Sequence, residues 1–206
     1  MATSNLEKAK IITAVAAKLN VPNTWLDAVV RNESGYRTSI ANPAEASSAK
    51  GLIQFIDKTA QWLGYASSQE LVDQNEDFAT QMWGPVLKYF QHYAPYDSLY
   101  EFSMAPFLPA MKNKPPNTRL PDWAIKANTV GGVPLFTVTG DYEKLLLKNQ
   151  INPKKLLTQK YEAEIEQAIE DGDLPRPPAY RPRLKVGAIA VVAAVAAGAW
   201  WLIKNK

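Results

Sequence analysis

Apolar residues recur at helical spacing through most of residues 5–170. Near the N-terminus they share one face of a predicted helix: Leu6, Ile11, Ile12, Val15 and Leu19. Ser4, followed three positions later by Glu7, forms a capping box, so this helix is expected to begin there. Because charged residues interrupt the apolar run, the segment is interpreted as an amphipathic core helix and not as a secretory signal.

Further helical segments follow, separated by Gly, Pro and small polar residues. Residues 76–93 form a long predicted helix with a kink at the Gly84-Pro85 pair. Residues 130–139 are the only strand-like stretch. The other predicted helices are 25–33, ended by Gly35, one that ends at Gly64, a short one capped by Ser67 or Ser68, then 97–111, 141–149 and 153–170. The pattern therefore predicts a mainly α domain over residues 1–172.

The C-terminal part has a different pattern. Residues 173–185 contain four prolines among basic residues, which is typical of an extended linker. Residues 186–203 carry no charge, and as a helix these 18 residues would span about 27 Å of a hydrocarbon core of about 30 Å. Trp200 and Trp201 lie near one end, and residues 204–206 form a basic tail. We therefore predict one transmembrane helix over 186–203, with a buried core helix as the alternative.

Small residues recur every four positions along the predicted span, at Ala190, Ala194 and Gly198. Such a face lets two membrane helices approach closely, which favours association with a second helix. In an alanine-rich segment the same spacing also arises by coincidence, and both interpretations stay open.

Composition and charge exclude several classes of function. The net charge of +3 comes from the tail, because residues 1–172 hold 17 basic and 19 acidic residues. This mildly acidic domain does not have the basic surface of a nucleic-acid-binding protein. The absence of Cys excludes thiol nucleophiles and thiolate metal sites, and the single His92 leaves no multi-histidine site. Carboxylates are the remaining candidates for catalysis.

Glu33 is the first candidate among these carboxylates. It lies at the C-terminal end of an apolar helix, immediately before a turn. The negative end of the helix dipole and neighbours such as Val29 and Val30 favour the protonated carboxyl, which a general acid needs near neutral pH. The alternative is a glutamate that faces solvent at a helix end.

The surrounding motifs resemble the catalytic stretch of lytic transglycosylases, lysozyme-like enzymes that cleave the glycan of bacterial peptidoglycan. The resemblance rests on Glu33-Ser34-Gly35-Tyr36, Ser47–Ala49, Gly51-Leu52-Ile53-Gln54-Phe55 and Lys58-Thr59-Ala60. It implies a lysozyme-like fold over residues 1–172, with Glu33 as the catalytic acid and base. It also implies a substrate site in which Ser34 holds the glutamate or the substrate, Tyr36 is the aromatic residue that follows, and Gln54, Phe55 and Ile56 line the sugar cleft.

The chain departs from the family pattern at two places. Asp57 stands where the family often has Pro. The family's downstream Ala-Tyr-Asn-x-Gly-Pro block, whose Tyr bonds near the catalytic carboxylate, has only a degraded counterpart in residues 101–106, and Phe102 cannot make that bond. The run from Leu99 to Pro106 resembles a variant found in phage-borne members, where Tyr100 takes the role. Tyr100 and Phe102 are therefore further candidates for the substrate site.

The resemblance also implies the reaction, a non-hydrolytic cleavage of the bond between N-acetylmuramic acid and N-acetylglucosamine that leaves 1,6-anhydro ends. Hydrolytic glycosidases pair two carboxylates, and Asp57, Glu45 and Glu101 lie in no recognisable second-carboxylate motif. Residues 128–141 lack the acidic ligand set of a calcium loop, so neither a metal nor a cofactor is predicted.

A domain without a predicted secretory signal, followed by a membrane span, suits a phage virion protein. Such a protein would open the wall locally when the genome enters the host. The predicted location is a single-pass anchor in the virion or the host cell membrane, with the domain facing the wall. Two alternatives stay open. One is a muramidase that hydrolyses the same bond, and the other is a catalytically silent, membrane-anchored peptidoglycan binder or structural virion protein.

Overall fold

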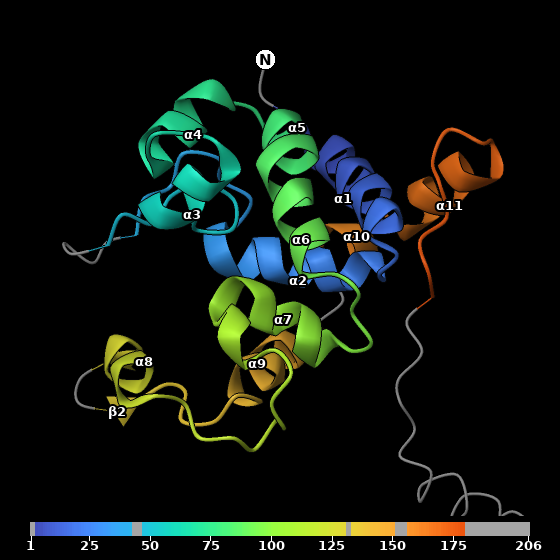
Figure 1. The fold of residues 1–206 in the computed structure, drawn as a ribbon. Coiled ribbons are helices and arrows are strands. Elements are labelled where there is room, and N and C mark those ends of the chain that lie inside the picture. The colour runs from blue at the N-terminus through green and yellow to red at the C-terminus, as the bar shows by residue number, and fades with distance from the viewer. Residues whose placement is uncertain (1–2, 43–46, 131–132, 151–155, 180–206) are drawn as a thin grey trace, which may run out of the picture.

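The computed structural model describes residues 3–42, 47–130, 133–150 and 156–179. Helices dominate this part of the chain, as the apolar pattern predicts (Figure 1). The elements are α1 Asn5–Leu19, α2 Asn23–Ser34, α3 Asp57–Leu63, α4 Ser68–Gln74, α5 Phe78–Gln81, the π-helical turn η1 Met82–Val86, α6 Leu87–Tyr93, α7 Leu99–Phe107, the 3₁₀ turn η2 Pro109–Met111, α8 Asp122–Ala127, β1 Thr129–Val130, β2 Val133–Pro134, α9 Asp141–Gln150, α10 Leu157–Lys160 and α11 Glu162–Glu170.

Helix starts follow the predicted capping chemistry. The Ser4 hydroxyl accepts a hydrogen bond from the Glu7 N–H at the start of α1, and Ser67 does the same for Glu70 at the start of α4. The predicted kink at Gly84-Pro85 lies inside η1, which joins α5 to α6. Pro85 has no N–H to donate, so the helix widens by one residue at this point.

The predicted strand over 130–139 is wrong for most of its length. Within the described residues, β1 and β2 contribute two residues each to a single antiparallel pair. Residues 135–140 instead form a loop that leads into α9. The apolar pattern there reflects packing of Phe136 against a neighbouring cluster, and not membership of a sheet.

Helix α2 occupies the centre of the fold. It packs against α1, α7, α9 and α10, and its inner face is fully buried at Leu26, Ala28 and Val29. Its carboxyl end lies between α3 and α4 on one side and α7 and α9 on the other (Figure 1). Residues at that end are therefore held by the core on one side and approach two different groups of helices on the other.

An aromatic cluster joins α7 to this centre. The Phe102 ring stacks on Phe90 of α6, with centroids 4.4 Å apart and an interplanar angle of 8°. Trp25 of α2 and Tyr96 contact the same ring at centroid distances of 6.1 and 5.0 Å. Such ring pairs add to the energy of apolar burial, so this cluster fixes α7 against α2 and α6.

The chain after α11 stays on the domain for as far as it is described. The N–H groups of Asp173 and Leu174 donate to the Ala168 carbonyl, and Arg176 pairs with Glu166 at 2.8 Å. Among the described residues, no helix has both the length and the apolar character needed to cross a membrane. The predicted span 186–203, including Ala190, Ala194 and Gly198, lies outside them.

Candidate active site

Glu33 occupies the last turn of α2, as the sequence predicts. Gly35 closes the helix in the left-handed conformation, with φ +59°, and its N–H donates to the Arg31 carbonyl at 2.9 Å. Glu33 therefore lies at the negative end of the helix dipole, where a protonated carboxyl is favoured over a carboxylate.

Tyr142, in the first turn of α9, is the direct partner of Glu33. Its hydroxyl donates a hydrogen bond to the Glu33 carboxylate, and the Asn32 side-chain amide donates to the Tyr142 oxygen at 3.0 Å. Burial raises the pKa of Glu33, and the hydrogen bonds from Tyr142 and Asn32 offset only part of that rise. Glu33 is therefore a carboxyl group whose proton is retained to higher pH than usual.

The Tyr142 ring is held by two aromatic neighbours. Phe107 stacks on it at a centroid distance of 4.9 Å and an angle of 8°, and Phe136 meets it edge-on at 5.7 Å. Burial and the nearby Glu33 carboxylate raise the pKa of Tyr142 well above its ordinary value. The phenol therefore stays neutral and keeps its proton for the hydrogen bond to Glu33.

The domain also has an open apolar cavity of about 620 Å³. Aromatic and aliphatic groups from three parts of the chain line it, with a lysine and a threonine among them: Lys58, Thr59, Trp62, Tyr89, Tyr93, Leu108, Pro109 and Ala110. Burial chiefly raises the pKa of Tyr89 in the cavity wall, and the Glu33 carboxylate contributes to the rise. Aromatic walls with a few polar groups are typical of ligand-binding clefts.

Trp62 is the most accessible aromatic side chain of this cavity. It is 46% exposed and packs edge-on against Tyr89 at a centroid distance of 6.3 Å. The His92 ring also contacts it, at a centroid distance of 4.4 Å. The two neighbours hold the indole while much of its surface stays open. Trp62 was not among the residues identified from the sequence, because its motif context is that of an ordinary helix position.

Ser34 and Tyr36 do not take the predicted roles. Ser34 is 2% exposed, and its hydroxyl donates back to the Val30 carbonyl at 3.0 Å, within α2. The Tyr36 hydroxyl donates to the Asp27 carboxylate at 2.7 Å. Both side chains therefore stabilise α2 and its exit loop, and in this structure neither hydroxyl is directed to Glu33.

The three predicted cleft residues after Gly51 differ from one another. Gln54 has φ +54°, and its amide donates to the carbonyls of Ile40 and Gly51 at 3.2 and 3.0 Å. Phe55 is buried against Tyr89 at a centroid distance of 5.5 Å, behind the cavity wall. Ile56 is 47% exposed. The structure thus leaves only the Ile56 side chain of these three well open to solvent.

Tyr100 and Phe102 are corrected by the structure. The Tyr100 hydroxyl donates to the carbonyls of Lys114 and Met111 at 2.7 and 3.3 Å, so it does not serve Glu33. Phe102 is completely buried in the aromatic cluster and has no surface for a substrate. Tyr142 supplies the hydroxyl that the degraded block lacks. The sequence shows only that Tyr142 lies in the first turn of a predicted helix. Nothing in the sequence connects this tyrosine to Glu33.

Asp57, Glu101 and Glu45 are the candidates for a second carboxylate. Two of them accept hydrogen bonds from neighbouring residues of the chain. Asp57 accepts hydrogen bonds from the Ser68 N–H and hydroxyl at 2.8 and 2.7 Å, which lower its pKa. Glu101 accepts from the Asp97 N–H at 2.7 Å. Glu45 lies outside the described residues. In the described ranges, no three acidic or histidine side chains gather as they would to hold a metal ion.

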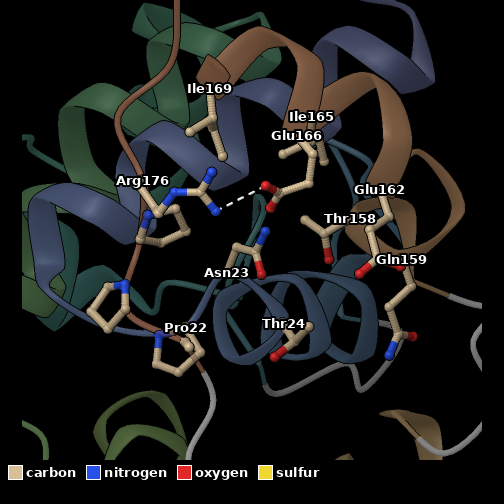
Figure 2. A pocket seen from close by; sticks show the side chains of 13 residues that line it. Pro22, Asn23, Thr24, Thr158, Gln159, Glu162, Ile165, Glu166, Ile169 and Arg176 are labelled. Atoms are coloured by element: carbon tan, nitrogen blue, oxygen red, sulfur yellow. Dashed lines mark hydrogen bonds and ion pairs between the residues drawn. The ribbon is translucent and has the colours of Figure 1, made fainter. Parts of the chain in front are cut away.

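A second cavity, of about 220 Å³, lies at the other end of α2 (Figure 2). Asn23 and Thr24 from the start of α2, Thr158 from α10, and the Arg176–Glu166 pair line it. A helix of 12 residues extends about 18 Å. The start of the Pro-rich segment is thus docked at the end of α2 that lies away from Glu33.

The comparison with family models gives a match over part of the chain. Residues 10–94 match the model described as the transglycosylase SLT domain, whose family consists of lytic transglycosylases acting on peptidoglycan. The predicted enzyme class is thereby confirmed. The match includes Glu33 and ends before Tyr142. The searches of curated proteins and of solved structures found no match.

Proposed function

Because residues 10–94 match the transglycosylase SLT domain, we propose that the chain cleaves the β-1,4 bond between N-acetylmuramic acid and N-acetylglucosamine without water. The products would carry 1,6-anhydromuramic acid ends. The observation that carries this proposal is the hydrogen bond from the Tyr142 hydroxyl to a Glu33 carboxyl whose pKa is raised by burial.

Glu33 performs both proton transfers in this reaction. Its protonated carboxyl donates a proton to the glycosidic oxygen as the bond from that oxygen to the muramyl C1 breaks. The resulting carboxylate then removes the proton of the muramyl C6 hydroxyl, and that oxygen bonds to C1 and closes the ring. Atoms balance without water, and Glu33 ends protonated as it began.

Tyr142 stabilises the ionised form of Glu33 that exists between the two proton transfers. A neutral phenol that donates to a carboxylate lowers the free energy of the ionised form, which exists between the two proton transfers. The groups whose hydrogen bonds act on Glu33 are Tyr142 and Asn32, and both are neutral donors. The absence of a recognisable second-carboxylate motif in the sequence supports a mechanism with one carboxylate over a hydrolysis that needs a second one.

The cavity lined by Trp62 and Tyr93 supports binding of a glycan strand. Sugar rings have apolar faces that pack on aromatic side chains, while their hydroxyls need polar partners at the edge of the site. Trp62 and Tyr93 supply aromatic surface, and Lys58 and Thr59 supply polar groups of the same cavity.

We also propose that residues 186–203 anchor the enzyme in a membrane as a single span. The uncharged run, its paired Trp200 and Trp201, and the basic residues on both sides support this. The Arg176–Glu166 pair at the far end of α2 supports a tether that leaves Glu33 free to meet the wall. Association through Ala190, Ala194 and Gly198 belongs to the same proposal.

The biological role that this layout supports is local opening of the wall as a phage genome enters its host. In this proposal the protein is part of the virion or lies in the host cell membrane, with the domain facing the wall. The Pro-rich segment supplies reach between an anchored end and a rigid glycan network.

The experiment is digestion of purified peptidoglycan by the full-length protein in detergent, followed by mass analysis of the released muropeptides. Anhydro ends that are absent with Glu33→Gln support the proposal. Reducing muramic acid ends, heavier by one water, would instead identify a muramidase. Release of no fragments by a folded protein would identify a binder without activity.

A further inference from the structure

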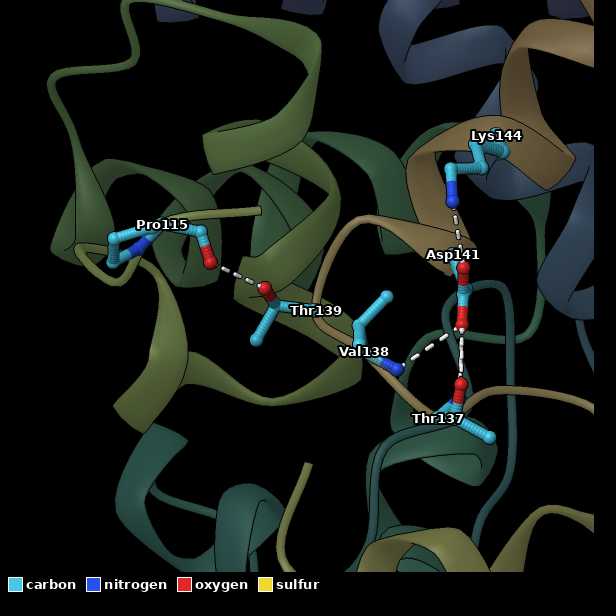
Figure 3. A network of polar contacts seen from close by, with 6 residues as sticks. All are labelled: Pro115, Thr137, Val138, Thr139, Asp141 and Lys144. Atoms are coloured by element: carbon cyan, nitrogen blue, oxygen red, sulfur yellow. Dashed lines mark hydrogen bonds and ion pairs between the residues drawn. The ribbon is translucent and has the colours of Figure 1, made fainter. Parts of the chain in front are cut away.

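The Asp141 carboxylate organises the turn that precedes Tyr142 (Figure 3). One of its oxygens accepts from the Thr137 and Val138 N–H groups at 2.9 and 3.0 Å, and from the Thr137 hydroxyl at 3.2 Å. The other oxygen accepts from the Lys144 amino group at 2.9 Å. One side chain thus connects the loop before α9 with the first turn of that helix.

The same turn is anchored to the neighbouring loop. The Thr139 hydroxyl donates to the Pro115 carbonyl and the Gly140 N–H donates to the Pro116 carbonyl, both at 2.7 Å. A Cβ at Gly140 would lie 2.9 Å from that Pro116 oxygen, so only glycine allows this approach. The backbone immediately before Tyr142 is therefore fixed on two sides.

We propose that Asp141 is a positioning residue, whose hydrogen bonds to the 137–138 backbone hold the start of α9 so that Tyr142 reaches Glu33. This inference rests on the proposed function, since the position of Tyr142 affects turnover only if Glu33 is the acid. Phe107 and Phe136 restrict the Tyr142 ring, while Asp141 restricts the backbone that carries it.

Charge and burial fit this assignment. Burial of Asp141 would raise its pKa, but hydrogen bonds from Thr137, Lys144 and Val138 outweigh burial and lower the pKa to about 2. Asp141 is therefore a carboxylate under all ordinary assay conditions. Lys144 is largely exposed and adds little through its ion pair, so the two backbone N–H groups are the contacts that matter.

The first test is Asp141→Ala in the full-length protein. Small displacements of catalytic groups are costly, so kcat should fall about tenfold while KM changes less than about twofold. A weaker Tyr142 bond leaves the pKa of Glu33 higher, so the fall of kcat/KM at high pH should move to higher pH. Tyr89, whose pKa the Glu33 carboxylate also raises, is not altered by this substitution. Asp141→Asn retains one acceptor oxygen and should restore most of kcat.

Two control variants separate positioning from general effects. Lys144→Ala removes the ion pair and leaves the N–H contacts, so kcat should stay within about twofold of the wild-type value. Asp122→Asn breaks the exposed Arg119–Asp122 pair at 2.5 Å in the neighbouring helix α8 and should leave both kcat and the pH profile unchanged. A loss in Asp122→Asn equal to that in Asp141→Ala would overturn the proposal.

The decisive comparison repeats Asp141→Ala in a Tyr142→Phe background. Because both changes act on one hydrogen bond, the double variant should be no slower than Tyr142→Phe alone. A full additional tenfold loss would show that Asp141 acts by another route and would overturn the proposal. If Asp141→Ala does not fold, Asp141→Ser replaces it in the same comparison with the same two outcomes.

The proposal and the proposed function fail in different ways. If Tyr142→Phe keeps full activity while Glu33→Gln is inactive, the acid is correct and the positioning role is wrong. If Glu33→Gln is active, the proposed function is itself wrong.

Discussion

The Tyr142 hydroxyl donates a hydrogen bond to the Glu33 carboxylate across 109 positions of the chain. Helix α9 supplies the phenol and helix α2 the acid, and the contact joins the segment matched by the SLT family model to a segment outside it. The two side chains therefore meet only when both segments fold together.

Tyr142→Phe should lower kcat by about ten- to a hundredfold, because the ionised form of Glu33 loses its charge-assisted hydrogen bond. That bond lowers the Glu33 pKa, so its loss raises the pKa further and moves the fall of kcat/KM at high pH upward. Rates of wall digestion across a pH series measure both effects.

The matched control for this variant is Tyr100→Phe. Its hydroxyl bonds to the Lys114 and Met111 carbonyls, so removing it should change stability and leave kcat and its pH profile unchanged. A pH shift in Tyr100→Phe with none in Tyr142→Phe would reverse the assignment of the two tyrosines.

Parts of this site could be predicted from the sequence because they depend on local chemistry. The end of α2 at Gly35, the caps at Ser4 and Ser67, and the place of Glu33 in the last turn of α2 follow from residues close together in the chain. Tyr142 could not be predicted, because its contact with Glu33 is set by how α9 packs on α2 and α7.

The incorrect assignments have a common physical cause. A motif position says which residue type occurs, and it does not say which helix face points to the core. Phe102 lies on the core face of α7, and Ser34 uses its hydroxyl within its own helix, as buried serines in helices often do. In the strand-like stretch 130–139, Phe136 packs from a loop, while Val133 and Leu135 are exposed.

Trp62→Ala should raise KM for glycan strands several-fold and change kcat less, because the indole supplies binding surface and does not contact Glu33. Initial rates on soluble glycan fragments over a concentration series separate the two constants. Trp123→Ala is the control, since Trp123 is 65% exposed on α8 and outside the cavity lining. An equal rise of KM in both variants would contradict the cavity as the glycan site.

Asp27 should make the fold less stable as pH rises. Burial raises its pKa despite hydrogen bonds from Thr158 and Tyr36, so the folded state holds the proton more tightly than the unfolded state. This stabilisation is present below the ordinary Asp pKa and is lost as pH rises through the raised folded value. Asp27→Asn has no titratable group at this position, so its stability lacks this pH dependence.

Denaturant unfolding of the wild type and Asp27→Asn over the same pH series checks this prediction. The wild type should lose free energy of unfolding relative to the variant as pH rises through that window. A difference that stays constant with pH, or that grows in favour of the wild type, would contradict a raised pKa.

A fragment of residues 1–179 should be monodisperse, melt cooperatively and digest peptidoglycan. It keeps the Arg176–Glu166 pair and the contacts of residues 173 and 174 with Ala168, so the described fold is complete. Full-length protein should partition with detergent or lipid, and the fragment should stay in the aqueous phase. An aggregated, inactive fragment with an aqueous full-length protein would contradict the membrane anchor.

The most direct test of a single-carboxylate mechanism is digestion of peptidoglycan in water labelled with a heavy oxygen isotope. If Glu33 takes the C6 hydroxyl proton and that oxygen closes the ring, the released muramic acid ends are anhydro and contain no solvent oxygen. We expect that result for the wild type and no released ends for Glu33→Gln. Labelled oxygen at C1 of the wild-type products would show that water attacks, and would contradict the single-carboxylate mechanism.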